Sequence, residues 1–194
     1  MVSASASSLK RSGFTVIELM AVVAVGAVLA ALLLPALGGA RGAALRTREV
    51  ACGKALMAGV VNYASEHDGR MIAGYKSDVA YGPDGRQLAY PASARYPWRL
   101  LPYIGGGTRD VMWANPAGSH ESISDAASES YAVSVSPTFG MNVFYVGGDD
   151  TGNSGQGIKP TARNFATYGK FALTTYGEAA SPAGQIVFAS ARMK

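Results

Sequence analysis

The longest run of hydrophobic positions lies near the start of the chain, at residues 14–37. These 24 residues contain one charged side chain, Glu18, and they follow two basic residues, Lys10 and Arg11. As an α-helix the run would be about 36 Å long, more than the hydrocarbon core of a bilayer, which is about 30 Å thick. The pattern predicts a membrane-spanning helix, with a kink at Pro35, which removes a backbone donor.

Residues 38–69 combine polar and apolar positions with the period of a helix. Apolar side chains recur three, four or seven residues apart, and most charged side chains lie off this stripe. The stripe consists of Leu45, Cys52, Leu56, Val60 and Tyr63. Asp68-Gly69 then supplies a turn that ends the helix. We expect a second, amphipathic half of the same helix, with its apolar stripe packed beneath the domain that follows.

The remaining residues, 70–194, show no long helical period. A short helical turn is expected at residues 98–103, with its aromatic side chains packed on the long helix, and a flexible glycine-rich loop at residues 147–157. Three short runs have the character of β-strands, namely 131–135, 141–146 and 185–189. The predicted fold class is therefore α+β, a long N-terminal hydrophobic and amphipathic α-helix followed by a small C-terminal domain with an antiparallel β-sheet.

Charge and cysteine content limit the partners and the covalent cross-links that we expect. The 194 residues carry 17 basic and 13 acidic side chains, but two of the basic ones, Lys10 and Arg11, precede the apolar run. Without them 15 basic and 13 acidic side chains give a net charge of only +2, so we expect no nucleic acid as a partner. The single cysteine, Cys52, excludes an internal disulfide, and its helical position predicts a small packed side chain.

The N-terminal segment could be a secretory signal, a plain membrane anchor or something more specific. A secretory signal has a shorter apolar core followed by a small-residue cleavage site, whereas here Gly13 precedes a long run. A plain anchor would not be expected to hold a carboxylate such as Glu18, because an ionised group in a bilayer is costly and usually has a partner. The next basic residue is Arg41, so we expect the partner to come from outside this helix or from processing.

Cleavage after Gly13 would supply such a partner. It would free an α-amino group on Phe14, and this amine could pair with Glu18 of a neighbouring copy of the chain. A pairing of this kind sets an axial offset between subunits, which is what a filament needs. The positive-inside rule does not settle the orientation, since basic residues lie on both sides of the run.

The sequence Gly13-Phe14-Thr15-Val16-Ile17-Glu18 after a basic leader resembles the processing site of type IV prepilins and type II secretion pseudopilins. The resemblance implies that a prepilin peptidase cuts after Gly13 on the cytoplasmic side, that Phe14 is then methylated, and that Glu18 aligns subunits. It also implies a bend at Pro35. Further on, the chain looks similar to prepilin-like proteins of planctomycete and verrucomicrobial bacteria at residues 96–104, 139–142, 145–149 and 186–192. This second resemblance implies no activity.

The resemblance implies a domain organisation and a location. The chain divides into a leader at 1–13, a transmembrane and filament-core helix at 14–37, an amphipathic second half of the helix at 38–69 and a globular pilin-like domain at 70–194. The protein is expected to be a single-pass inner-membrane protein, with its N-terminus cytoplasmic and its domain periplasmic, until it enters a periplasmic or surface filament. Its partners would be the prepilin peptidase, other copies or homologous pilin subunits, the inner-membrane assembly platform and membrane lipid.

The leading hypothesis is a structural subunit of a type II secretion pseudopilus or of a type IV pilus-like filament. Many type IV pilins close their C-terminal region with a disulfide, so the single Cys52 slightly favours a pseudopilus. The alternative is a membrane-anchored binding module for a ligand or DNA, which a basic, aromatic-lined groove would support. No enzyme is expected, because His67 and His120 lack metal-ligand spacing and no nucleotide-binding or nucleophile motif is present.

One loop offers candidate calcium ligands. Asp149, Asp150 and Asn153 place oxygen ligands on a glycine-rich stretch, which can suit calcium, although the spacing is not that of an EF-hand. The resemblance to pseudopilins, whose major members bind calcium in a C-terminal loop, makes calcium a candidate ligand but assigns the role to no particular residue of this chain. A solvated turn is the favoured interpretation, and no other cofactor is expected.

Overall fold

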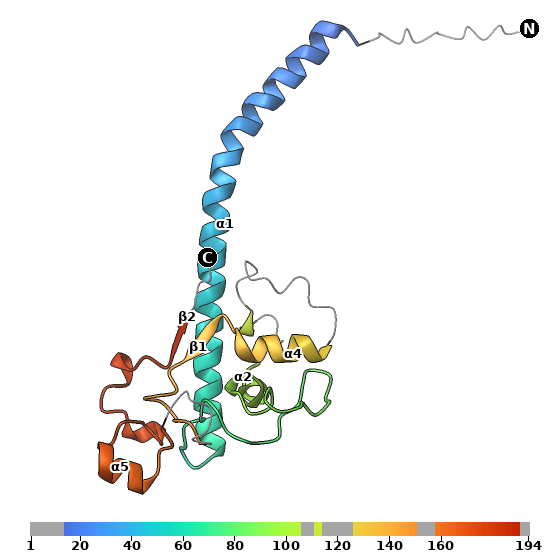
Figure 1. Ribbon diagram of the computed structural model, residues 1–194. Coiled ribbons are helices and arrows are strands. Elements are labelled where there is room, and N and C mark those ends of the chain that lie inside the picture. The colour runs from blue at the N-terminus through green and yellow to red at the C-terminus, as the bar shows by residue number, and fades with distance from the viewer. Residues whose placement is uncertain (1–13, 106–110, 114–125, 151–157, 191–194) are drawn as a thin grey trace, which may run out of the picture. The chain divides into compact units, whose positions relative to one another are not determined.

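The protein is described by a computed structural model that covers residues 14–105, 111–113, 126–150 and 158–190, with only the backbone described at 35–37 and 126. Helices dominate, and the strands are short (Figure 1). The elements in chain order are α1 (Val16–Glu66), α2 (Tyr96–Leu100), η1 (Leu101–Tyr103), α4 (Ala126–Val135), β1 (Phe139–Met141), α5 (Ala162–Tyr168), η3 (Tyr176–Glu178), η4 (Pro182–Gly184) and β2 (Phe188–Ser190). The α+β class with a long N-terminal helix is confirmed.

The chain forms two compact units, Met1–Ala44 and Leu45–Lys194. In the first unit, α1 exposes its large apolar side chains over several turns; Ile17, for example, is 79% exposed. Such exposure is what a helix surrounded by lipid or by other apolar helices requires. Among the described residues, α1 is the one helix that is long and apolar enough, by length and composition, to cross a membrane.

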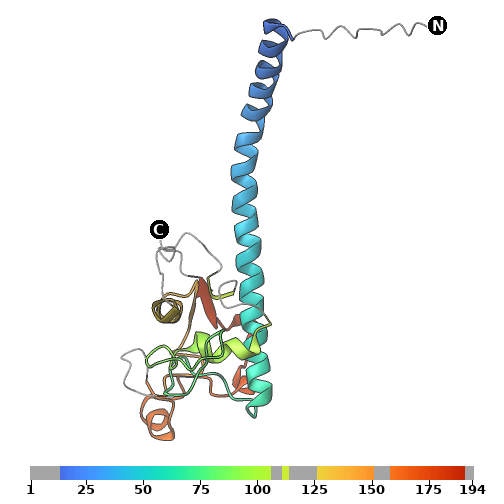
Figure 2. The ribbon, with the colours of Figure 1, turned by 90° about the vertical axis from the view of Figure 1, so that its right-hand side faces the viewer.

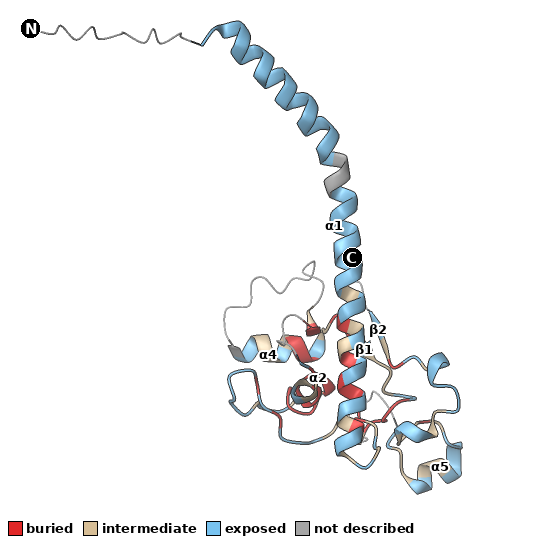
Figure 3. Cartoon of the chain, turned by 180° about the vertical axis from the view of Figure 1, so that it is seen from behind, coloured by how far each residue is buried: buried red, intermediate tan, exposed pale blue. Residues whose placement is uncertain are grey.

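In the second unit, residues 45–66 of α1 bury one face against the rest of the domain. Cys52, Leu56 and Val60 are 6%, 0% and 0% exposed, and Figure 3 shows this buried face on the C-terminal part of α1. The elements that follow α1 gather on one side of this part of the helix (Figure 2). The predicted stripe is thus confirmed from Cys52 onward, but Leu45, at the edge of the unit, is 38% exposed.

The helix ends where the sequence predicts. α1 stops at Glu66, and the next turn places Asp68 at φ 53° and Gly69 at φ 75°. The Gly69 N–H donates to the Ala64 carbonyl at 2.8 Å, which satisfies one of the carbonyls left without a partner at a helix end. The chain therefore leaves the helix through a left-handed turn.

The aromatic segment after residue 95 packs on α1, as predicted. All five residues of α2 are buried, and Trp98 is 2% exposed. A Cβ on Gly59 of α1 would lie 2.5 Å from the Ile104 side chain and 3.4 Å from Leu100, so the absence of a side chain lets the two segments approach closely. At the end of α1 the rings of Tyr63 and Tyr103 meet edge to face, with centroids 5.2 Å apart.

The sheet is smaller than predicted. Over the described residues it has two antiparallel strands, β1 and β2, with Phe139 opposite Ser190 and Met141 opposite Phe188. The run at 141–146 contributes only Met141, because the chain turns directly after the strand: the Val146 N–H donates to the Asn142 carbonyl at 3.0 Å. The run at 185–189 is shifted, since the strand is Phe188–Ser190.

The predicted strand at 131–135 is wrong, because these residues form the second half of helix α4. Alternating apolar residues suggested a strand, but of these three side chains Val133 is buried, at 1% exposure, while Tyr131 and Val135 are about half exposed. Packing fixes the helix in place: the Trp98 indole N–H of α2 donates to the Ser130 carbonyl at 2.9 Å. A tertiary contact therefore decided between two local structures that the five-residue pattern could not distinguish.

The start of the predicted flexible loop is packed instead. Gly147, Gly148 and Asp149 are buried, and the Gly74 N–H donates to the Gly148 carbonyl at 3.0 Å. The Asp150 N–H donates to the Tyr75 carbonyl at 2.9 Å. Residues 147–150 therefore run beside residues 72–75, and the rest of the predicted loop, 151–157, lies outside the described residues.

A charged cluster holds the segment before η3. The Glu178 carboxylate accepts hydrogen bonds from the backbone N–H groups of Thr174 at 2.7 Å and Thr175 at 3.2 Å, and it pairs with the Lys170 ammonium at 3.0 Å. Partial burial would raise the pKa of Glu178, but these hydrogen bonds outweigh it and lower the pKa to about 2. The ordinary value is 4.5, so the ionised form stabilises the fold.

This cluster predicts a pH dependence of stability. Because the folded pKa lies below the ordinary one, the contribution of Glu178 is fully present above about pH 4.5 and is lost as pH falls toward about 2. The variant Glu178→Gln should cost at most about 1 kcal/mol at pH 7, since the group is partly solvated. Urea titrations of both proteins should show that the difference disappears between these pH values. A difference that is constant with pH would contradict the assignment.

A fragment of residues 38–194 should be soluble, folded and monomeric. It lacks the exposed apolar turns of the first unit, while the buried residues of α1 (Cys52, Leu56 and Val60) remain covered by the domain. Light scattering after gel filtration and circular dichroism would check this, with the full chain in detergent-free buffer as a control that should aggregate. An aggregated or unfolded fragment would show that the domain needs the first part of α1.

Candidate functional site: the N-terminal end of α1

The first turn of α1 carries the residues that the sequence singled out. Gly13 lies outside the described residues, and the described chain begins at Phe14, which is 73% exposed. The helix starts at Val16, directly after Thr15. Because every side chain of this turn is exposed, the turn is accessible to a processing enzyme or to a second copy of the chain.

Glu18 is held by Thr15 in a reciprocal set of hydrogen bonds. The backbone N–H and the hydroxyl of Thr15 both donate to Glu18 Oε2 at 2.8 Å, and the Glu18 N–H donates to Thr15 Oγ1 at 3.3 Å. This is a capping box, which satisfies backbone donors that a helix N-terminus leaves without partners. A carboxylate at this end of a helix is also favoured by the helix dipole.

The capping box corrects one expectation in part. The sequence suggested that any partner of Glu18 must come from outside the helix or from processing, yet Thr15 of the same chain donates two hydrogen bonds to the Glu18 carboxylate. A charged partner from a neighbouring copy or from processing stays a prediction. The absence of nearby basic residues leaves open the neutral donors on the N-terminal side of Glu18. The signal that would have found them is the spacing Thr-x-x-Glu immediately before an apolar run.

Pro35 is the other residue of this helix with an expected role. The backbone is helical through Pro35, within the single element Val16–Glu66. A proline in that position leaves one carbonyl without its usual N–H partner. The expected kink stays a prediction.

The calcium candidates do not form one exposed cluster. Asp149 is 0% exposed, which contradicts a solvated turn at that position, and the Asp150 carboxylate pairs with the Lys159 ammonium at 3.3 Å. Asn153 lies outside the described residues. In the part of the chain that the structure describes, no three or more acidic, histidine or cysteine side chains come together as a metal site. Calcium binding in this loop stays a prediction.

Buried Asp149 lies beside a buried tyrosine. It is paired with Tyr75 in an isolated β-bridge. Burial, reinforced by hydrogen bonding and charge repulsion from Tyr90 and by the charge of Asp149, raises the pKa of Tyr75 to about 12. The phenol is therefore neutral at any physiological pH, and the position of Asp149 is structural rather than that of an exposed ligand.

Comparisons with known proteins bear on the first turn of α1. The family model for the prokaryotic N-terminal methylation motif matches residues 8–34. No curated protein matches the chain, and no solved structure does. The match begins just before Lys10 and Arg11 and covers Gly13, Phe14 and Glu18. The chain therefore carries, at its N-terminus, the methylation motif that is the hallmark of the type IV prepilin and pseudopilin family.

Proposed function

We propose that this protein is a structural subunit of a type II secretion pseudopilus or type IV pilus-like filament, anchored in the inner membrane until it assembles. The observation that carries the proposal is the methylation motif on an exposed apolar helix whose first turn holds a carboxylate. In water such a helix would aggregate, whereas lipid or a bundle of identical helices would cover it.

Processing would complete the site. A prepilin peptidase would cut after Gly13 on the cytoplasmic face and the new N-terminal Phe14 would be methylated. The amine of Phe14 carries a positive charge and lies next in the chain to Thr15, which already holds Glu18. In a filament the amine of one subunit would reach Glu18 of its neighbour. Thr15 would then keep the carboxylate solvated by hydrogen bonds until that neighbour arrives.

The domain would face the periplasm, with the N-terminus in the cytoplasm. This topology rests on the resemblance to prepilin processing sites, which are cut on the cytoplasmic side. A pseudopilus is favoured over a pilus because the single cysteine, Cys52, is buried at 6% exposure and leaves no internal disulfide to close the domain. The role is structural rather than enzymatic, as is general for subunits with this motif.

Intact-mass analysis tests the processing step. Co-expression with a prepilin peptidase should remove residues 1–13 and add one methyl group to Phe14. A Gly13→Leu variant is the matched control, because a bulky residue at the cleavage position should leave the leader attached. Cleavage beyond Leu37 by an ordinary signal peptidase would contradict the proposal.

The alternative is an anchored binding module, in which the helix serves only as a tether. One observation favours it, a cavity edged by two exposed tyrosines in the second unit. Fractionation separates the two functions: a filament subunit appears in the material sheared from cells, whereas a tethered module stays with the membrane.

A further inference from the structure

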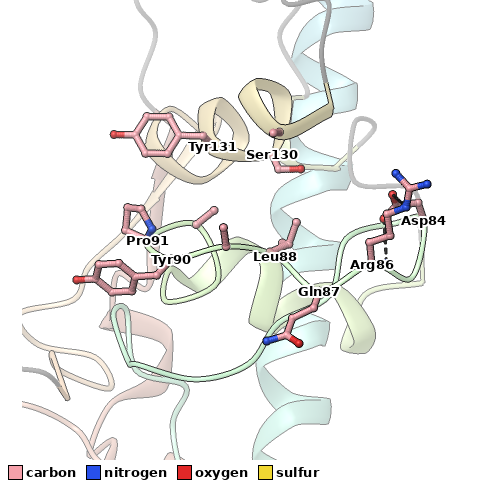
Figure 4. A pocket seen from close by; sticks show the side chains of 11 residues that line it. Asp84, Arg86, Gln87, Leu88, Tyr90, Pro91, Ser130 and Tyr131 are labelled. Atoms are coloured by element: carbon pink, nitrogen blue, oxygen red, sulfur yellow. Dashed lines mark hydrogen bonds and ion pairs between the residues drawn. The ribbon is translucent and has the colours of Figure 1, made fainter.

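A cavity of about 310 Å³ opens between the loop at residues 84–92 and helix α4. Leu88, Pro91 and Ala92 form part of its apolar wall, and Tyr90 and Tyr131 stand at one end (Figure 4). The cavity lies wholly within the second unit. It is independent of the N-terminal turn, so what it binds does not depend on the proposed filament role.

The two tyrosines are exposed although each is large and mostly apolar. Tyr90 is 69% exposed and Tyr131 is 48% exposed. They come from different elements, the loop before α2 and helix α4, yet both edge the same cavity, with their hydroxyl groups pointing the same way and away from the other lining residues (Figure 4). The rings, rather than the hydroxyls, are therefore what the cavity presents to a ligand.

A neighbouring side chain holds each ring in place, Arg95 for Tyr131 and Tyr75 for Tyr90. The Arg95 guanidinium lies 5.2 Å from the centroid of the Tyr131 ring, and Arg95 Nη1 donates to Ser134 Oγ at 3.1 Å. The ring of Tyr75, which is 8% exposed, meets Tyr90 edge to face with centroids 6.4 Å apart. Rings fixed in this way lose little conformational entropy on binding, which favours their use as contact surfaces.

The opposite end of the cavity is polar but carries no net charge. Arg86 Nε lies 3.6 Å from Asp84 Oδ2, and the backbone N–H of Arg86 donates to Asp84 Oδ1 at 3.1 Å. The neighbouring Gln87 adds an amide that can both donate and accept. A lining with one paired cation does not favour a polyanion such as nucleic acid, which requires an excess of basic groups.

We propose that this cavity binds a neutral glycan. A pyranose ring has an apolar face of C–H groups that packs on an aromatic ring, and hydroxyl groups around its edge that both donate and accept hydrogen bonds. Tyr90 and Tyr131 supply the apolar faces, and Gln87 with the Asp84–Arg86 pair supplies the donors and acceptors. A proline-rich peptide would also pack on the rings, but proline has no N–H, so such a peptide would offer fewer donors than a glycan to the acceptors of Asp84 and Gln87.

The test uses the full chain in a detergent that contains no sugar. Calorimetry would measure binding of neutral hexasaccharides of β-1,4-linked glucose, xylose and N-acetylglucosamine and of α-1,4-linked glucose. At least one should bind, and Tyr90→Ala and Tyr131→Ala should each weaken it about tenfold. Tyr131→Phe keeps the ring and should retain most of the affinity. Tyr168→Ala removes a tyrosine that is 64% exposed on α5, away from the cavity lining, and should change nothing.

A variant that fills the cavity controls for the case in which the alanine variants bind weakly because they have lost their fold. Ala127 is exposed and lines the cavity, so Ala127→Trp should block binding without removing a packed side chain. Failure of every hexasaccharide to bind would overturn the proposal, as would binding that Ala127→Trp and both tyrosine variants leave unchanged. Binding of a proline-rich decapeptide or of single-stranded DNA at these tyrosines, with no glycan bound, would also overturn it. None of these outcomes alters the mass test of N-terminal processing.

Discussion

Replacing Glu18 with alanine should leave a processed, membrane-resident protein that no longer enters filaments. The change removes an ionised group from an apolar helix, so insertion into the bilayer should become easier rather than harder. It also removes the partner proposed for the amine of a neighbour's Phe14, and an unpaired charge buried among apolar helices is strongly unfavourable. Comparing the membrane fraction with the sheared-filament fraction, in cells with their own assembly machinery, would measure the loss.

The capping box provides the matched control. Thr15→Val removes the hydroxyl that bonds Glu18 at 2.8 Å but keeps the carboxylate and the size of the side chain. This variant should weaken the first turn of α1 and still assemble, if pairing with a neighbour is what matters. A double variant, Ile17→Glu with Glu18→Ala, should not restore filaments, because it shifts the offset between subunits. A normal filament yield from Glu18→Ala would show that some other contact sets the register.

Replacing Gly147 with alanine should destabilise the domain by about 3 kcal/mol. Gly147 has φ +69°, and a Cβ there would lie 1.9 Å from the Ile72 carbonyl oxygen and 3.0 Å from the Ala73 Cα. Both are backbone atoms, and the adjoining backbone is tied by hydrogen bonds, since the Gly147 N–H donates to the Leu173 carbonyl at 2.9 Å. Neither side can move without breaking contacts of the core. Urea denaturation of fragment 38–194, followed by tryptophan fluorescence, would measure the effect.

Substitutions at two other glycines distinguish backbone strain from steric clash as the cause of the lost stability. Gly169 has φ +75°, but a Cβ there would meet nothing within 4 Å, so Gly169→Ala should cost only the backbone strain, about 1 kcal/mol. Gly177 has neither feature, so Gly177→Ala should leave stability nearly unchanged. If Gly147→Ala were no worse than Gly169→Ala, the segment beside Ile72 would be looser than the structure shows.

The long helix and its N-terminal motif could be predicted because their signals are local. An apolar run with one carboxylate after Gly13 needs no knowledge of the rest of the fold, and the methylation motif confirms this interpretation at residues 8–34. The buried face from Cys52 to Val60 follows from helical period alone. The capping box at Thr15 is equally local, but its donors are neutral, so the positions of charged residues do not reveal it.

The domain could not be predicted to the same degree, because its elements are short and depend on distant contacts. Residues 131–135 became helical where the Trp98 indole bonds the Ser130 carbonyl. Asp149 has the sequence context of a loop residue among glycines, yet it is buried, because the Gly148 carbonyl accepts from the Gly74 N–H and the Asp150 N–H donates to the Tyr75 carbonyl. The cavity edged by Tyr90 and Tyr131 brings together residues 41 positions apart, and no pattern within either segment predicts that they line one cavity.

Because α1 contributes residues to both units, its buried face is synthesised before the residues that cover it. The face of α1 formed by Cys52, Leu56 and Val60 leaves the ribosome well before its core partners, which include Trp98 and, near the end of the chain, Val187. Until those residues arrive the apolar face is uncovered, and contacts of such long sequence separation form slowly. A ribosome stalled before β2 should therefore leave a chain that is more open to proteolysis than the completed protein.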